Sequence, residues 1–246
     1  MGDPESAIME LEMVPARSVD CGEIYELKRR ELVELLRSLS TGELAITVPA
    51  TPEWSVRDVL SHVVGIAADL NARNFGDGDA DQWTAAQVQS RRNDTVADLA
   101  EEWDREAPTF ELGLRALGYE IGSHYVADLL QHAGDVRHGL RLPRLADDEA
   151  LAVALDFYLI TFEEALERAG LGAVEISVGP EHWILGTGET IASVTADRYE
   201  AFRSLGGRRN EAQIRALPWR GDLDMILPVV SRYPLPEAPI IEASLS

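Results

Sequence analysis

The sequence is poor in lysine, cysteine and uninterrupted apolar stretches, and each shortage excludes a class of protein. Lys28 is the only lysine, so arginine supplies almost all of the 22 basic residues. These face 43 acidic residues, which leaves a formal charge of −21. The electrostatic field of so negative a protein repels nucleic acid and anionic membrane surfaces, so neither is an expected partner. An anionic small molecule would need a local group of arginines to bind.

A single cysteine, Cys21, excludes an internal disulfide framework and an all-thiolate zinc site, and it is typical of a reducing compartment. No apolar stretch approaches the length that crosses a bilayer. The first residues lack the basic region and apolar run of a secretory signal. With 246 residues, 46% of them hydrophobic, the chain can bury a sizeable core. We therefore expect a globular cytoplasmic protein.

Apolar residues at helical spacing predict a helical region up to about residue 170. Residues 1–14 lack such a period and are expected to form a loose tail. Capping boxes at Ser55 and Thr95 predict two helix starts, and Pro108 is expected to kink or end the second of these helices. Further helices are predicted from Cys21 to Leu39, around residues 128–132 with an end near Gly139 or Pro143, and from Asp147 or Asp148 to Gly170.

Beyond residue 170 the pattern changes to short runs of period two at residues 174–178 and 190–195, which predict strands. Thr195 is then expected to cap a short helix that ends near Gly206. The predicted fold class is α+β: residues 15–170 form a helical bundle, and residues 171–246 form a small α/β domain.

The stretch from Asp128 to Asp135 carries the most chemical information. Successive helical residues turn through about 100°, so Asp128, His132 and Asp135 share one ridge, which His124 extends. A carboxylate and an imidazole at i and i+4 can hold one divalent metal, with His62 as a candidate third ligand. Equally, His62 and His132 could be histidines at the edge of the core that form hydrogen bonds to Asp128 or Asp135, without a metal.

Two segments carry a resemblance to a known family. Residues 54–65 (WSVRDVLSHVVG) and 128–135 (DLLQHAGD) resemble the two signatures of the mycothiol-dependent maleylpyruvate isomerase family, which belongs to the metal-binding DinB-like proteins. The resemblance implies an up-down four-helix bundle with a C-terminal α/β domain. It also implies that His62, Asp128 and His132 bind Zn²⁺ or another divalent metal. Where the family usually has glutamate this chain has Asp128, one methylene shorter, so the helices lie closer together or the metal is held more loosely.

The same resemblance implies an activity. A thiol bound to such a metal becomes a thiolate near neutral pH, and the family's thiol is mycothiol. Its addition to a small electrophile leads to cis-trans isomerisation, if the thiol leaves again, or to S-transfer, if it stays. Residues 202–209 (FRSLGGRR) resemble the arginine-bearing segment of the family's C-terminal domain, so Arg203, Arg208 and Arg209 are candidate partners of an anionic substrate. Equally, these three arginines could be ordinary surface charge.

Asp135 is expected to orient a ligand histidine through its second ring nitrogen. The alternative is that it pairs with Arg137 or another surface arginine. Two other functions fit the same residues: a non-catalytic protein that binds a metal or small ligand, and a metal-dependent hydrolase with water as nucleophile. The pattern identifies neither the substrate nor the oligomeric state.

Overall fold

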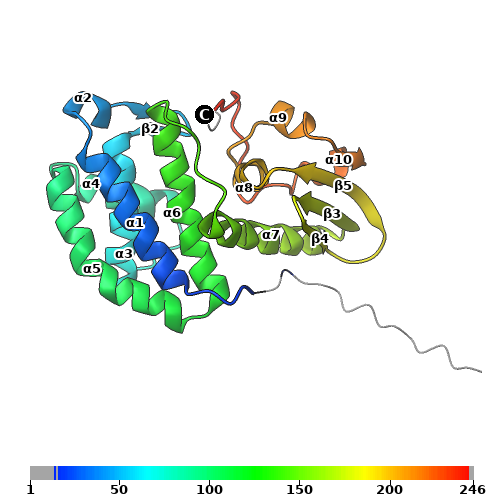
Figure 1. Cartoon of the computed structure of the whole chain (residues 1–246), viewed down its shortest axis with the longest axis horizontal. Helices are drawn as coiled ribbons and strands as arrows, with labels where there is room; N and C mark the ends of the chain where they lie inside the picture. Colours follow the sequence, from blue (N-terminus) through cyan, green and yellow to red (C-terminus); the bar gives the residue numbers. More distant parts are fainter. Residues whose placement is uncertain (1–13, 15, 244–246) are drawn as a thin grey trace, which may run out of the picture.

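The protein is described by a computed structural model that covers Val14 and residues 16–243 (Figure 1). Apart from Val14, the tail predicted at residues 1–14 lies outside this part of the chain. The elements are α1 (Cys21–Arg37), α2 (Thr41–Leu44), β1 (Thr47–Val48), β2 (Thr51–Ser55), α3 (Val56–Asn71), α4 (Ala80–Ser90), α5 (Val96–Ala116), α6 (Tyr119–Gly139), α7 (Glu149–Ala169), β3 (Ala173–Val178), β4 (Glu181–Leu185), β5 (Thr190–Ala196), α8 (Arg198–Leu205), α9 (Glu211–Arg215), β6 (Arg220–Gly221) and α10 (Leu223–Ile226).

Helices α1, α3, α5 and α6 pack against one another as a four-helix bundle, and α4 lies against α3 (Figure 1). The predicted capping boxes are confirmed: Ser55 and Asp58 begin α3, and Thr95 and Asp98 begin α5. Each box satisfies backbone N–H groups that a helix start leaves unpaired, which fixes the first residue of the helix. The register of α3 in the bundle therefore follows from a local sequence signal.

Pro108 was predicted to kink or end its helix. The predicted end is wrong, because α5 continues through Pro108 from Val96 to Ala116. Pro108 lies on the exposed side of the helix, as does Asp104 one turn earlier. A missing amide there leaves a carbonyl that water can reach, and the buried contacts of Trp103 and Phe110 hold the helix on both sides of the proline.

Helix α4 and the β1–β2 hairpin have no counterpart in the sequence-based prediction. Gln87 is the one buried residue of α4, so the helix has almost no apolar stripe to reveal it. Asp79 caps its start by accepting a hydrogen bond from the Gln82 amide. The hairpin is short and pairs Thr47 with Ser55, which brings Trp54 over the end of α3.

The C-terminal region contains a four-stranded sheet in the order β4-β3-β5-β6. Strand β3 is antiparallel to β4 and parallel to β5. Helix α7 packs on α6 and also on α8 and β4, so it joins the bundle to this sheet (Figure 1). The α+β class is confirmed. The division into domains at residue 170 stays a prediction.

Capping residues determine the end of α7 and the start of α8. Gly170 ends α7 with a φ of 64°, a left-handed conformation that suits glycine, as predicted. The predicted cap at Thr195 is wrong, because Thr195 belongs to β5 and Asp197 caps α8 by accepting a hydrogen bond from the Glu200 amide. Within residues 14 and 16–243, none of the helices combines the length and apolar character that crossing a bilayer requires.

Candidate metal centre

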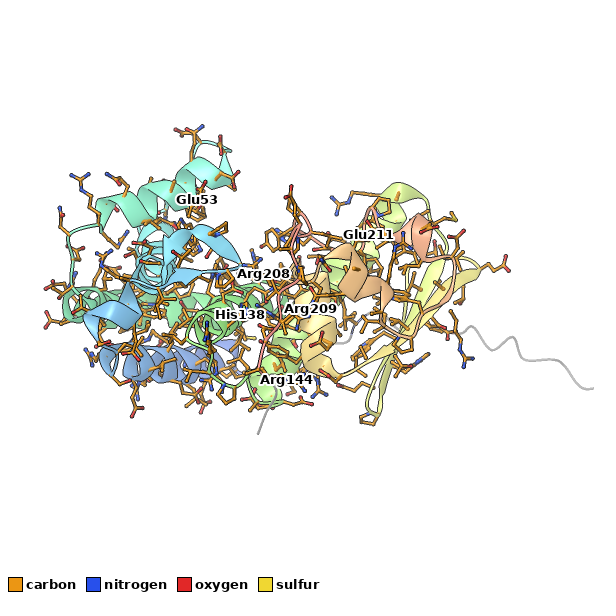
Figure 2. All side chains as sticks on the ribbon, turned by 90° about the horizontal axis from the view of Figure 1, so that it is seen from above. Glu53, His138, Arg144, Arg208, Arg209 and Glu211 are labelled. Atoms are coloured by element: carbon orange, nitrogen blue, oxygen red, sulfur yellow. The ribbon has the colours of Figure 1, made fainter. Side chains whose placement is uncertain are left out.

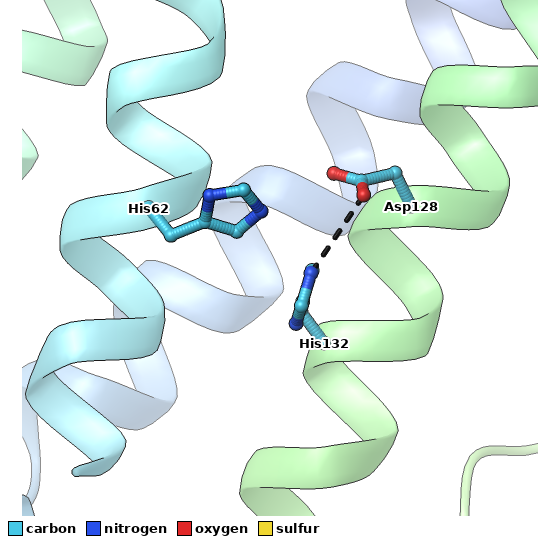
Figure 3. A group of neighbouring side chains, drawn as sticks. All are labelled: His62, Asp128 and His132. Atoms are coloured by element: carbon cyan, nitrogen blue, oxygen red, sulfur yellow. Dashed lines mark ion pairs between the residues drawn. The ribbon is translucent and has the colours of Figure 1, made fainter. Parts of the chain in front are cut away.

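The structure brings His62, Asp128 and His132 together, although they are far apart in the sequence. His62 projects from α3, and Asp128 and His132 project toward it from successive turns of α6 (Figure 3). One potential ligand atom from each lies within 4.8 Å of the other two. Nε2 of His132 is 3.7 Å from Oδ1 of Asp128, and the two imidazole centroids are 4.8 Å apart. The three residues that the sequence analysis singled out therefore form one cluster.

The His62 ring is held by a hydrogen bond from outside the cluster. Nδ1 of His62 lies 2.8 Å from Oε1 of Gln87, on α4. The amide nitrogen of Gln87 donates in turn to Oδ2 of Asp69, at 2.8 Å. Trp54 stacks at a tilt on the other side, with its ring centroid 4.9 Å from that of His62. The ring is therefore fixed between α4 and the β1–β2 hairpin.

Burial keeps both histidines neutral. It lowers the pKa of His132 to about 4 and lowers the pKa of His62 as well, because a charged imidazole loses its hydration in the protein interior. The charge of Asp128 opposes this effect at both rings but does not cancel it. Neutral imidazole is the form that binds metals, so these rings need not lose a proton at neutral pH.

The donor set fits a divalent cation. Two ligand atoms about 2.1 Å from a tetrahedral zinc ion are about 3.4 Å apart, close to the separation of His132 and Asp128. That distance is too long for a hydrogen bond between the two groups. Two neutral imidazoles and one carboxylate would leave a divalent ion with a net positive charge, and three protein ligands leave a coordination position open.

The cluster lies at the wall of a cavity of about 940 Å³. The bundle supplies the three candidate ligands on one side, and residues 207–240 of the C-terminal region close the other side. Much of the remaining lining is aromatic, aliphatic or proline: Pro49, Pro52, Trp54, Ile66, Trp83, Tyr125, Tyr158, Tyr233, Pro234, Pro236, Pro239 and Ile240. A small organic molecule could therefore be enclosed next to the cluster.

Of the three predicted arginines, only Arg208 lines this cavity. Figure 2 shows Arg208 and Arg209 at the junction between the bundle and the C-terminal region. Arg203 is fully buried and pairs with Asp135 at 2.7 Å and Glu242 at 2.9 Å. Arg209 pairs with Glu200 at 2.8 Å and Glu242 at 2.7 Å. Arg203 and Arg209 thus serve internal ion pairs, because carboxylates of the chain already occupy their guanidinium groups.

Asp135 does not form the predicted hydrogen bond to His132. Its Oδ2 lies 3.7 Å from Nδ1 of His132, and that nitrogen has no hydrogen-bond partner within the described part of the chain. The carboxylate of Asp135 instead receives Arg203 at Oδ1 and Arg208 at both oxygens. Two guanidinium groups give a buried carboxylate more hydrogen bonds than one imidazole can.

The other histidines lie apart from the cluster or serve different contacts. His124 also lines the cavity, but its ring stacks on Phe157 with centroids 4.3 Å apart, and it does not join the group of ligand atoms. His138 lies in the last turn of α6, and His182 contacts the hydroxyl of Ser177 in the sheet.

Three residues of the site escaped sequence-based prediction: Trp54, Gln87 and Arg232. Trp54 stands in the first signature but gave no signal of contact with a histidine. Arg232 lines the cavity and lies over the rings of Phe157 and Tyr233 at 5.3 and 5.8 Å. It forms no ion pair with any of residues 14 and 16–243. Its place in the site depends on the path of the C-terminal segment, which no local pattern indicates.

Cys21 lies away from this cavity, at the start of α1, and is 4% exposed. Burial, together with the charges of Asp20 and Asp156, raises the pKa of its thiol to about 11. At pH 8 a thiol with that pKa has about 100-fold less thiolate than one with a pKa of 9.

We expect iodoacetamide to alkylate Cys21 far more slowly in the folded protein than in urea, as measured by mass spectrometry. Equal rates in both states would contradict this burial.

The fold and the cluster define an α+β protein with a candidate metal centre between two helices of a four-helix bundle. Residues 25–124 match the family model described as "Mycothiol maleylpyruvate isomerase N-terminal domain", so this part of the chain is similar to that domain. The resemblance inferred from the sequence is thereby confirmed. The matched range includes His62 and ends before Asp128.

A crystal structure of a mutant of the mycothiol-dependent maleylpyruvate isomerase aligns with a TM-score of 0.46 and 12% sequence identity, over 76% of this chain and 88% of that chain. No curated protein matches the sequence.

Proposed function

We propose that this protein is a mycothiol-dependent enzyme that holds a divalent metal, Zn²⁺ in the first place, at His62, Asp128 and His132. Its substrate is a small electrophile that carries negative charge. The observation that carries the proposal is the convergence of three potential ligand atoms within 4.8 Å at the wall of a cavity. The family of the N-terminal domain supports mycothiol as the thiol.

A divalent metal in this position supplies the positive charge that lowers the pKa of a thiol and so favours the nucleophilic thiolate. The residues of the chain prepare the place for it. The two imidazoles are neutral, and Asp128 contributes the only negative charge among the three candidate ligands. Trp54 covers both rings, at centroid distances of 4.9 Å and 6.2 Å, and limits the access of water to them.

The thiol must come from outside the chain, because Cys21 lies on another face and stays protonated at neutral pH. Two cationic side chains can receive an anionic substrate in the cavity. Arg208 lines the cavity and is anchored there, because Nε and Nη2 donate to Asp135 and Nη1 donates to the Gly206 carbonyl. Arg232 reaches the same cavity from the C-terminal segment. A carboxylate in this otherwise acidic protein would find its partners there.

Two outcomes follow from the same nucleophilic attack. The thiolate sulfur adds to one carbon of a cis double bond, and the other carbon of that bond takes up a proton. The former double bond is then a single bond that rotates freely. Loss of that proton and departure of the same thiolate restore the double bond in the trans form, and no thiol is consumed. If the carbon–sulfur bond persists, the product is a thioether and one thiol is consumed per turnover.

The test is an assay of the zinc-loaded protein with maleylpyruvate, in the presence and absence of mycothiol. We expect conversion of the cis to the trans isomer only with the thiol, followed by NMR, while a free-thiol assay separates isomerisation from S-transfer. A substrate ester that lacks the negative charge should react less efficiently if Arg208 and Arg232 bind the carboxylate. Hydrolysis without thiol would instead indicate a metal-dependent hydrolase, and ligand binding without turnover would indicate a non-catalytic protein.

A further inference from the structure

The side chain of Gln87 links the candidate metal centre to helix α4 by a hydrogen bond. Gln87 is 2% exposed, and its carboxamide lies between two groups with different hydrogen-bonding abilities. Asp69 is a carboxylate that only accepts, so the nitrogen of the amide must face it, at 2.8 Å. The amide oxygen must then face His62, at 2.8 Å from Nδ1.

This orientation determines which ring nitrogen of His62 carries the proton. An amide oxygen only accepts, so Nδ1 of the neutral imidazole must be the N–H donor. The proton is then absent from Nε2, whose lone pair becomes available as a ligand toward Asp128 and His132. Asp69 is itself fixed, because its second oxygen accepts a hydrogen bond from Asn74 at 2.9 Å. A row of three side chains therefore sets the tautomer of His62.

Gly65 allows this contact to form. It lies three residues after His62 on α3, and a Cβ atom added there would lie 2.6 Å from Cβ of Gln87 and 2.7 Å from its Cγ. Real carbon atoms do not approach so closely. On the other side, Arg91, the residue that directly follows α4, pairs with Glu102 of α5 at 2.5 Å. Helix α4 is thus held between α3 and α5 at a distance that only glycine at position 65 permits.

We infer that Gln87 is a positioning residue for the metal centre: it accepts the Nδ1 proton of His62 and so presents Nε2 of that ring to a divalent cation. The inference rests on the proposed function, and it deepens it by assigning to α4 a part in metal affinity. Partners of this kind, which contact a ligand histidine but not the metal, typically change metal affinity by about 10 to 100-fold when removed.

The experiment uses the full chain, with two readouts and four variants. In the metal-free protein, long-range ¹H–¹⁵N correlation of the imidazoles reports which nitrogen of His62 carries the proton. Zinc affinity is then measured by competition with a chelator of known affinity. The variants are Gln87→Leu, Gln87→Glu, Gly65→Ala and, as the matched control, Gln89→Leu, which changes an exposed glutamine of the same helix.

We expect Nδ1–H at His62 in the wild type and in Gln87→Glu, because a carboxylate still accepts the proton. Gln87→Leu should lose this preference and bind zinc about 10 to 100-fold more weakly. Gly65→Ala should weaken zinc binding in the same direction, because it displaces an unchanged Gln87. The control should match the wild type in both readouts. Thermal melts show whether each variant is folded.

Two results would overturn the role of Gln87: a His62 proton on Nε2 in the wild type, or zinc affinity unchanged in folded Gln87→Leu. If the wild-type protein binds no zinc at all, the proposed function fails. In that case the ring proton of His62, measured without metal, still decides whether Gln87 sets the tautomer.

Discussion

Replacing His62 or His132 by alanine is expected to remove metal from the protein. Each change deletes one of three potential ligands, and two remaining ligands hold a divalent ion much less tightly. The loss of affinity should exceed the roughly 100-fold that removal of an outer partner can produce. The wild type should retain about one zinc ion per chain after dialysis, as measured by elemental analysis, because one such cluster is found among the described residues.

The matched control for this experiment is His182→Ala. His182 is an exposed histidine in strand β4, and it contacts Ser177 rather than the cluster. Its replacement should leave both metal content and thiol-dependent activity at the wild-type level. If His62→Ala and His132→Ala keep their metal, the ion is bound elsewhere and the proposed centre is wrong.

Replacing Asp135 by alanine is expected to destabilise the fold strongly. Asp135 is fully buried and accepts hydrogen bonds from Arg203 and Arg208. Its removal leaves Arg203 with Glu242 and Arg208 without a carboxylate partner. Breaking a buried ion pair from one side typically costs about 3 to 5 kcal/mol. Urea denaturation monitored by circular dichroism measures the change in the free energy of unfolding.

The pH dependence of this contribution follows from the pKa of Asp135. Burial opposes ionisation, but Arg208 and Arg203 together hold the pKa of this carboxyl well below its usual range. A carboxyl whose pKa is lower in the folded state stabilises the fold at all pH values above its unfolded pKa, about 3.9. The stabilisation is lost only as the pH falls below that value. The wild type and Asp135→Ala should therefore differ fully at neutral pH and converge in strong acid.

An exposed ion pair provides the comparison. Glu211 and Arg215 lie one turn apart at the surface of α9. Water and salt screen such pairs, so Glu211→Ala should change the denaturation midpoint very little. A similarly small effect of Asp135→Ala would contradict the structural role assigned to the buried carboxylate.

Local signals in the sequence predicted most of the helical part of the fold. Ser55, Thr95 and Asp148 mark helix starts because a capping side chain acts within its own turn. Gly170 marks a helix end for a similar reason. Helix α4 lacked such a signal in its interior, since one buried residue does not make an amphipathic pattern.

The site was predictable in its core and not in its surroundings. The spacing of Asp128 and His132 on one ridge, with the resemblance around His62, predicted the residues that converge. The contact of Gln87 with His62 depends on how α4 packs, which no local pattern encodes. The internal ion pairs of Arg203 and Arg209 were not predictable, because their carboxylate partners lie in other parts of the sequence.

The two walls of the cavity come from separate stretches of the chain. The candidate ligands belong to α3 and α6, whereas the opposite wall comes from residues 207–240. Substitutions in the second stretch could alter which molecules are accepted while leaving the reactive centre intact. The lining of the cavity and the candidate metal centre can therefore change independently of each other in the sequence.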